Sequence, residues 1–261
     1  MKLFVVADVH GFYDEMKAAL DAAGFDPANE DHMLISCGDA IDRGPRPNEV
    51  IKYFVNLPRK ILIRGNHEDL LDDLLNNPWG PYMHDHQNGT YNTAIELASK
   101  CRKVREGYKI SKTMAQYLGW EEVAKYAIAE PTYRKYRDLL VDYAEIGNYI
   151  FVHGWLPCLC KTDLNGGKIC HKYKLLPNWR DADLLTWEKA RWINGFECTV
   201  QNIFEDGKTI VCGHIHAAAW NEYFYKKKPY EDHNTYVGEN VIALDTCTAL
   251  SKKVNVLVIE V

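Results

Sequence analysis

The sequence predicts an α/β fold built on a largely parallel sheet, and three observations carry this prediction. Short β-rich apolar runs alternate with helix-like segments over the first 68 residues, as in parallel sheets with right-handed crossovers. Five apolar runs along the chain end abruptly in polar residues. Strand-like runs also resume after two long stretches that lack them, which indicates one domain with two insertions.

The first third of the chain shows the alternation most clearly. Expected strands at 3–7, 33–37 and 60–64 are separated by expected helices at about 12–24 and 47–56. The first helix has apolar residues at helical spacing and stops at Gly24. These elements predict the core of the sheet.

The whole chain, 1–261, is predicted to form a single domain that carries a helical cap insertion at about 69–140 and an irregular insertion at about 155–205. Helices are expected at about 91–104, 112–129, 132–140 and 182–193. Strands are expected at 141–146, 149–152, 209–212, 220–225, 241–245 and 254–260, the last three as an antiparallel meander.

Composition limits the classes of function. The formal charge of −5 offers no basic footprint for nucleic acid. No apolar run approaches the roughly 18 residues that span a bilayer, and the first residues lack a signal-peptide core. We therefore expect a cytoplasmic protein that binds neither nucleic acid nor membrane, while its oligomeric state stays open.

The eight cysteines are expected to be reduced thiols, since a cytoplasmic chain does not keep a disulfide framework. Cys158, Cys160, Cys170 and His171 form a cluster that could hold a structural zinc ion, although their spacing fits no established ligand pattern. Unliganded thiols are the alternative, and the role of the cluster stays open.

The five polar segments are the main indication of function. Each follows an expected strand and therefore lies at the carboxyl edge of a sheet, where sites form in open α/β folds. They are Asp8-Val9-His10, Gly38-Asp39-Ala40-Ile41-Asp42-Arg43-Gly44, Gly65-Asn66-His67-Glu68, His153-Gly154 and Gly213-His214-Ile215-His216. Carboxylate, imidazole and amide groups are ligands of divalent metals that activate water. The segments together predict a two-metal hydrolytic centre.

The spacing inside these segments suits metal binding. In an extended segment, residues i and i+2 point the same way, so Asp8 and His10 can reach one ion. Asp39 can bridge two ions through its carboxylate, and Asn66 offers a neutral oxygen that keeps the metals electrophilic. His214 and His216 repeat the i, i+2 spacing, and His153 completes the set.

The order D-x-H, G-D-x-x-D-R-G, G-N-H-E, H-G and G-H-x-H resembles the calcineurin-like metallophosphoesterases. The R-G-N-H-E and D-R-G forms look most like the PPP branch, which includes serine/threonine protein phosphatases, their bacterial and phage relatives, and diadenosine tetraphosphatases. The resemblance covers both ends of the chain, including I-A-L-D-T at 242–246, but neither insertion. It implies a four-layer αββα sandwich of two mixed sheets.

The resemblance also implies ligand sets for two divalent metal ions. Asp8, His10 and Asp39 would hold one ion, with His216 as a further ligand in the wider superfamily. Asp39, Asn66, His153 and His214 would hold the other. Manganese is the expected metal, and iron, zinc and nickel fit the same ligands.

The implied reaction is hydrolysis of phosphomonoesters by in-line attack of a metal-bridging hydroxide. His67 is the expected acid for the leaving group, oriented by Asp42, and Arg43 is the expected clamp on the phosphoryl oxygens. Arg191 is the expected second phosphate-binding arginine, because it follows a tryptophan shortly before the last histidine segment. Arg64 is expected to support its loop through an ion pair with Glu68 or Asp42.

Three hypotheses for the function stay open, two of them enzymatic and one non-catalytic. The leading hypothesis is a PPP-type serine/threonine protein phosphatase, which acts on phosphorylated proteins or small phosphate esters. Hydrolysis of dinucleoside polyphosphates of the diadenosine tetraphosphate type is the alternative. A non-catalytic protein-binding scaffold is the third hypothesis, and it would predict eroded ligands, whereas every expected ligand position is filled.

Overall fold

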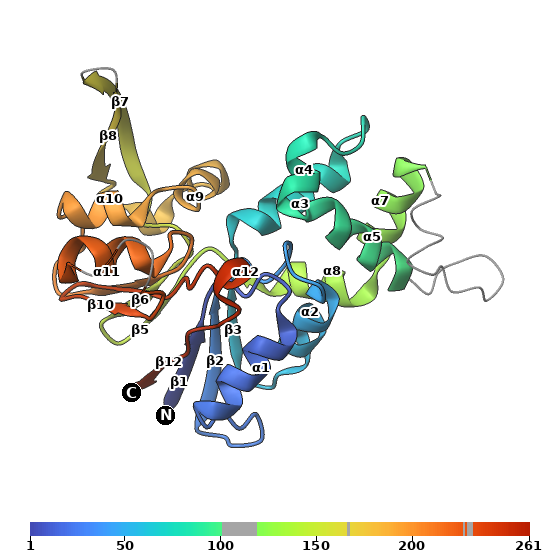
Figure 1. Cartoon of the computed structure of the whole chain (residues 1–261), viewed down its shortest axis with the longest axis horizontal. Coiled ribbons are helices and arrows are strands. Elements are labelled where there is room, and N and C mark those ends of the chain that lie inside the picture. Colours follow the sequence, from blue (N-terminus) through green and yellow to red (C-terminus); the bar gives the residue numbers. More distant parts are fainter. Residues whose placement is uncertain (101–118, 166–167, 227, 229–231) are drawn as a thin grey trace.

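The first of two five-stranded sheets is built from the start of the chain and completed by its last strand (Figure 1). The computed structural model describes residues 1–100, 119–165, 168–226, 228 and 232–261. Strand order is β12-β1-β2-β3-β4, with β1 to β4 parallel and β12 antiparallel to β1. The bounds are β1 Lys2–Val6, β2 His32–Cys37, β3 Lys60–Ile63, β4 Leu140–Val141 and β12 Leu257–Glu260.

The second sheet is formed by the later part of the chain, in the order β10-β11-β9-β6-β5. Its three central strands are parallel, and both edge strands are antiparallel to their neighbours. The bounds are β5 Ala144–Ile146, β6 Tyr149–Phe151, β9 Thr209–Cys212, β10 Tyr236–Val237 and β11 Val241–Ala243. Both sheets are therefore mixed, as expected.

Helices cover the outer faces of the two sheets. The first sheet is covered by α1 Tyr13–Ala22, α2 Pro47–Asn56, α3 Asn66–Asn76, α5 Thr90–Lys100, α7 Trp120–Ala129 and α8 Pro131–Leu139. The second is covered by α9 Leu184–Ala190, α10 Gly195–Val200 and α11 Ala217–Tyr225. Two further short helices are α4 Met83–Asn88 and α12 Thr248–Ser251.

Three apolar cores separate these layers. Alternate residues of β1 divide between them: Leu3 and Val5 pack against the second sheet, whereas Phe4 and Val6 pack against helices. In β9, Val211 likewise belongs to the core between the sheets. This period of two is what a strand buried on both faces requires. The four-layer αββα architecture predicted from the resemblance is confirmed.

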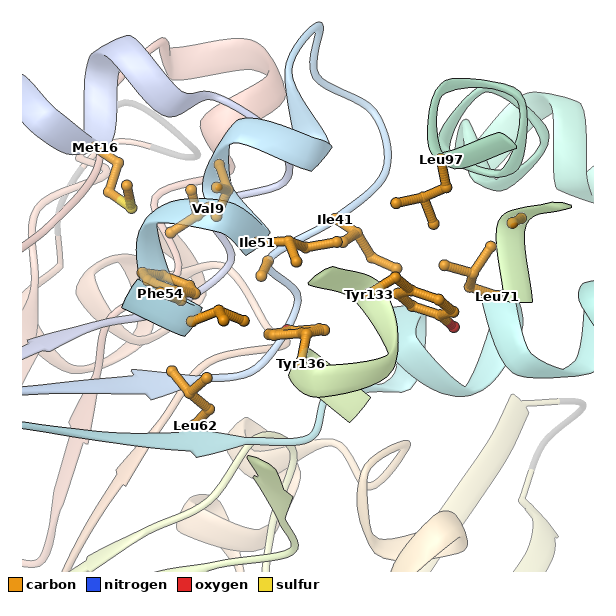
Figure 2. Close-up of a cluster of buried hydrophobic side chains, with 14 of the residues drawn as sticks. Val9, Met16, Ile41, Ile51, Phe54, Leu62, Leu71, Leu97, Tyr133 and Tyr136 are labelled. Atoms are coloured by element: carbon orange, nitrogen blue, oxygen red, sulfur yellow. The ribbon is translucent and has the colours of Figure 1, made fainter. Parts of the chain in front are cut away.

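The core outside the first sheet also includes the helical insertion. Figure 2 shows Phe54 of α2 and Tyr136 of α8 above Leu62 of β3, with Leu71 of α3 and Leu97 of α5 in the same cluster. Burying each such side chain contributes about 1.5–3 kcal/mol. The insertion thus packs directly on the sheet. The expected helix at 112–129 is present as α7, and its residues before 119 lie outside the described residues.

Three expectations for the last hundred residues are wrong. The segment 220–225 is the end of α11 rather than a strand, because Ala217, Trp220 and Asn221 are buried at helical spacing. The closing meander is absent from the described strands, since β12 pairs with β1 in the other sheet. The insertion at 155–205 contains an antiparallel hairpin, β7 Cys158–Asn165 and β8 Lys168–Leu175, before α9 and α10. Figure 1 shows this hairpin projecting from the body.

Among the described residues, no helix combines the length and apolar character needed to cross a bilayer.

Candidate metal centre

The polar segments that follow the parallel strands meet at one edge of the two sheets. Asp8, Asp39 and Asn66 come from the ends of β1, β2 and β3, whereas His153 and His214 come from the ends of β6 and β9. A pocket of about 140 Å³ lies at this edge. Its lining is Asp8, His10, Asp39, Arg43, Asn66, His67, Leu70, Asn88, Trp192 and His214. Sequence-distant groups thus share one small, polar pocket.

The backbone at this edge adopts an unusual conformation. Asp8, His10, Asp39 and His214 all have positive φ, at 51°, 49°, 53° and 67°. Residues other than glycine rarely adopt this left-handed backbone conformation, which costs them about 1–2 kcal/mol per residue. Such strain concentrates at functional sites, where the surrounding structure holds it in place.

Two glycines leave room for the carboxylates. A Cβ built on Gly213 would collide with the Asp8 carboxylate, and one built on Gly65 would collide with that of Asp39. Neither glycine has positive φ, so close approach alone explains the lack of a side chain there. Each carboxylate therefore sits in a cradle that a larger residue would fill.

The ring hydrogen bonds of two histidines turn lone pairs toward Asp39. Nδ1 of His10 donates to the carbonyl oxygen of Ile41 at 2.9 Å, which leaves Nε2 3.7 Å from Oδ2 of Asp39. Nδ1 of His153 donates to the carbonyl oxygen of Cys37 at 2.9 Å, which leaves Nε2 3.3 Å from Oδ1 of Asp39. Fixing the tautomer through the second nitrogen is typical of metal-binding histidines.

Oxygen and nitrogen acceptors converge in the same place. Oδ1 of Asn66 lies 2.7 Å from Nε2 of His153 and 3.0 Å from Nδ1 of His214. When Nδ1 of His153 donates to Cys37, Nε2 presents its lone pair to this amide oxygen, and a cation between the two acceptors would stabilise the arrangement. Asp39 also belongs to both groups of ligand atoms that lie within 4.8 Å of one another, with His10 and His67 in one and Asp8 and His153 in the other. The chemistry of these donors fits two cations that share Asp39.

The electrostatics of the cluster point the same way. Burial lowers the pKa of His10 to about 3 and that of His214 to about 3, so both rings are neutral ligands at pH 7. Burial, and then Asp245 and Asp39, raise the pKa of Asp8 well above its usual value. Burial would also raise the pKa of Asp39, but neighbouring imidazoles, His153 first, lower it. Bound cations would stabilise these crowded carboxylates in the ionised form.

His67 and Asp42 form a separate pair at the rim of this cluster. Nδ1 of His67 donates to Oδ2 of Asp42 at 2.7 Å, and Nη2 of Arg43 donates to Nε2 of His67 at 3.2 Å. Burial would lower the pKa of His67, but the charges of Asp39 and Asp42 outweigh burial and raise it. His67 thus differs from His10 and His153, whose Nδ1 atoms donate to backbone carbonyls.

The helical insertion holds this pair in position. Thr90 and Thr93 of α5 both donate their hydroxyl hydrogens to Asp42, each at 2.7 Å. Asp42 can therefore keep its carboxylate fixed toward His67. The Glu68 carboxylate links the segments that follow β2 and β3, since it accepts hydrogen bonds from the backbone N–H groups of Gly65, Asp39 and Ala40.

The expectations for Arg191 and Arg64 require correction. Arg191 lies outside the pocket: its buried guanidinium donates to Asp69 at 2.5 and 3.1 Å and to Asp142 at 2.7 Å. Two carboxylates thus satisfy the group that was expected to bind phosphate. Arg64 pairs with Asp69 and Asp72 rather than with Glu68 or Asp42.

His216 also stands apart from the pocket. Its Nε2 lies 3.8 Å from Oδ2 of Asp245, and its side chain is 36% exposed. Asp245 follows β11 in the I-A-L-D-T segment, so it obeys the same strand-end pattern as the other segments, although no role was assigned to it from the sequence. Leu70, Asn88 and Trp192 line the pocket without any such signal in the sequence, because they reach it from helices or from turns beside helices.

The cysteine cluster is divided by the hairpin register. Thr162 is opposite His171, and Cys160 Sγ lies 3.7 Å from Nδ1 of His171, whereas Cys170 is in register with Asp163. Both groups of potential metal ligands found among the described residues lie at the sheet edge, and neither contains a cysteine.

Comparisons with known proteins agree with this geometry. The family model for calcineurin-like phosphoesterases matches residues 1–232. Serine/threonine-protein phosphatase 2 of Escherichia coli is 28% identical over 174 residues, which cover 58% of this chain and 78% of that protein. The asymmetrical bis(5'-nucleosyl)-tetraphosphatase PrpE of Bacillus subtilis is 34% identical over 102 residues, 36% of this chain and 40% of that protein.

Other matches are shorter or more distant. A symmetrical bis(5'-nucleosyl)-tetraphosphatase of Aeromonas salmonicida is 39% identical over 64 residues, so the match spans about a quarter of each protein, 24% and 23%. Two structures of cold-active protein tyrosine phosphatase cover 99% of this chain and 73% and 75% of theirs, with TM-scores of 0.55 and 0.53. At 17% and 16% identity these structures show a shared fold.

Proposed function

The chain belongs to the calcineurin-like phosphoesterase family, and from that premise we propose that it hydrolyses phosphomonoesters, with phosphoserine and phosphothreonine in proteins as substrates. One observation carries the proposal: two sheets deliver metal-ligand side chains into a single small pocket beside the His67–Asp42 pair. The E. coli phosphatase supports the choice of substrate, because its match covers 78% of its length. Dinucleoside polyphosphate hydrolysis is the second candidate, supported by the tetraphosphatases.

A separate set of residues is proposed for each metal position. We propose that Asp8, His10 and Asp39 hold one divalent cation, and that Asp39, Asn66, His153 and His214 hold the second. His216 would join the first set only if its ring turned away from Asp245. Two such cations would supply charge neutralisation and a water of lowered pKa. Manganese and a cytoplasmic location belong to the same proposal.

Arg43 would orient the phosphoryl group. It lines the pocket, and a planar guanidinium matches two phosphoryl oxygens better than an ammonium does. In the structure Arg43 donates to Nε2 of His67, which requires that nitrogen to be unprotonated. A phosphoryl oxygen that attracts Arg43 would therefore free Nε2 to carry a proton.

His67 would then deliver that proton to the leaving alkoxide. Its raised pKa favours the protonated ring, and Asp42 holds Nδ1 so that Nε2 faces the pocket. Proton transfer by a positioned imidazole contributes roughly 10²–10⁴-fold to a rate. Asp42 acts through His67 and is thus a positioning residue.

The test replaces the acid and compares leaving groups. His67→Asn should reduce kcat on an alkyl phosphate by roughly 10²-fold or more, and on p-nitrophenyl phosphate much less, because nitrophenolate needs no proton to leave. Metal content should be unchanged. His84→Asn is the matched control, since His84 is 57% exposed on α4. Equal losses on both esters would contradict the acid role.

The scaffold alternative predicts a different result. A protein that only binds a partner would bind metal weakly or turn over neither ester at any pH. Metal analysis together with a pH-resolved assay on p-nitrophenyl phosphate, with manganese, iron, zinc and nickel supplied in turn, separates the enzyme from the scaffold and identifies the most active metal.

A further inference from the structure

A second pocket adjoins the metal centre and shares one residue with it. This second pocket, which we name the Lys252 pocket, has a volume of about 580 Å³. Its lining is Phe12, Arg43, Gly44, Pro45, Pro47, Asn92, Glu96 and Lys252. Arg43 is common to both linings, so the two pockets are neighbours on either side of this residue.

The shared residue places the Lys252 pocket on one side of the reacting phosphate. Arg43 contacts Nε2 of His67, the nitrogen that faces the leaving group in the proposed mechanism. The leaving group must therefore lie beside Arg43. The part of the substrate beyond the bond that breaks would extend past Arg43 into the second pocket.

The charges in this pocket favour an anion. Neither Arg43 nor Lys252 forms an ion pair with a carboxylate in the part of the chain that the structure describes. The ammonium of Lys252 donates to the carbonyl oxygen of Ala249 at 2.7 Å and lies 4.3 Å from the ring centroid of Phe12. Glu96 is the acidic residue of the lining, and it is only 7% exposed and engaged in an interaction of its own.

Lys252 is also held in a fixed position relative to the metal centre. It caps α12, where its N–H donates to the carbonyl oxygen of Thr248 at 3.0 Å. The Thr248 hydroxyl in turn donates to the carbonyl oxygen of Asp8 at 2.8 Å. A cation anchored to the backbone of a metal ligand loses little freedom when it binds a charged group.

We propose that the Lys252 pocket binds a second anionic group of the substrate, attached on the leaving-group side, and that Lys252 is a specificity-determining residue for it. This inference rests on the proposed phosphoesterase function and narrows its substrate class. The anion has two chemical sources: the distal phosphates of a nucleotide, or an acidic side chain that follows a phosphorylated residue.

The experiment compares Lys252→Gln with Lys253→Gln in the metal-loaded protein. Lys253 is an exposed neighbour outside the pocket lining, so the control removes the same charge one residue away. The four substrates are p-nitrophenyl phosphate, diadenosine tetraphosphate, and two phosphoserine peptides that differ only by Asp or Asn after the phosphoserine. We expect Lys252→Gln to lower kcat/KM roughly fivefold on the matching anionic substrate and to leave p-nitrophenyl phosphate unchanged, as one partly exposed charge pair implies.

Each result decides the matter. A loss of kcat/KM confined to diadenosine tetraphosphate or to the Asp peptide supports the inference and identifies the source of the anion. This loss should be smaller at high salt. Equal loss on all four substrates, loss on none, or the same loss in Lys253→Gln overturns it.

A wild-type protein inactive on every substrate would instead refute the proposed function. Calorimetric binding of ADP then decides the inference separately. Binding weakened roughly fivefold in Lys252→Gln but not in Lys253→Gln supports an anion site, and equal binding in the two variants overturns it.

Discussion

Substitution of Gly213 by alanine tests whether close packing positions Asp8 as a metal ligand. The new Cβ would lie 3.1 Å from Cγ of Asp8 and 2.9 Å from Cβ of Ala7, closer still to the carboxylate oxygen, whereas ordinary contact begins at 3.4 Å. Some group must therefore move by at least 0.5 Å, the difference between 3.4 and 2.9 Å. Metal sites tolerate about 0.2 Å in ligand distance.

The expected result is a loss of metal affinity larger than the loss of stability. Displacing a ligand through its surroundings typically weakens metal binding 10–100-fold, or about 1.4–2.7 kcal/mol. Overpacking itself costs about 1–3 kcal/mol of stability, so unfolding of the metal-free protein must be measured in parallel. Gly119→Ala is the control, since beyond its chain neighbours no atom of a described residue lies within 4 Å of the added Cβ, and its φ is negative.

Metal titration by calorimetry and the metal-induced rise in Tm are the assays. Adding Asp8→Asn to Gly213→Ala should weaken metal binding little further, because both changes act through one carboxylate. If Gly213→Ala binds metal as tightly as Gly119→Ala, the cradle argument is refuted.

Three further predictions concern the acid pair, the metal and a surface ion-pair cluster. Asp42→Asn should lower kcat on alkyl phosphates by roughly 10²-fold with metal content unchanged, and it should alter the alkaline limb of the pH–rate profile, which a purely structural change would leave in place. Removal of metal by a chelator should lower Tm, because the crowded carboxylates lose their counter-charge, and the divalent metal should restore it; an unchanged Tm would count against a metal site. Arg180 donates to Glu145 and Glu205, and these hydrogen bonds lower the pKa of both carboxyls. Folded-state pKa values below the unfolded value of 4.5 mean that the stabilisation is present above about pH 4.5 and is lost as the pH falls through the folded values. Arg180→Met should therefore destabilise by about 1 kcal/mol or less at pH 7 and by progressively less as the pH falls below about 4.5 in denaturant melts; a pH-independent difference would contradict this origin.

The side chains that meet at the sheet edge could be predicted from the sequence because their signal is local. A β-rich run followed at once by Asp, Asn or His is visible without any knowledge of the fold. The parallel arrangement then brings these strand ends together. The same pattern holds at Asp245, which belongs to the quoted I-A-L-D-T segment but received no role.

The features that escaped prediction depend on contacts across the fold. No local pattern shows that Arg191 meets Asp69 and Asp142, 122 and 49 positions away. The aromatic end of α11 has strand-like composition, yet burial of Trp220 against the second sheet decides for helix. The β7–β8 hairpin alternates few apolar residues, so the segment was predicted to be irregular.

The left-handed backbone at the metal centre has a consequence for how this protein can evolve. Each of those positions lowers thermostability, and glycine would relieve the conformation but delete the ligand. Selection for higher thermostability must therefore act on other parts of the protein, namely helices, loops and surface charges. A thermophilic homologue should keep Asp, His, Asp and His at positions 8, 10, 39 and 214, with its gains in the outer layers.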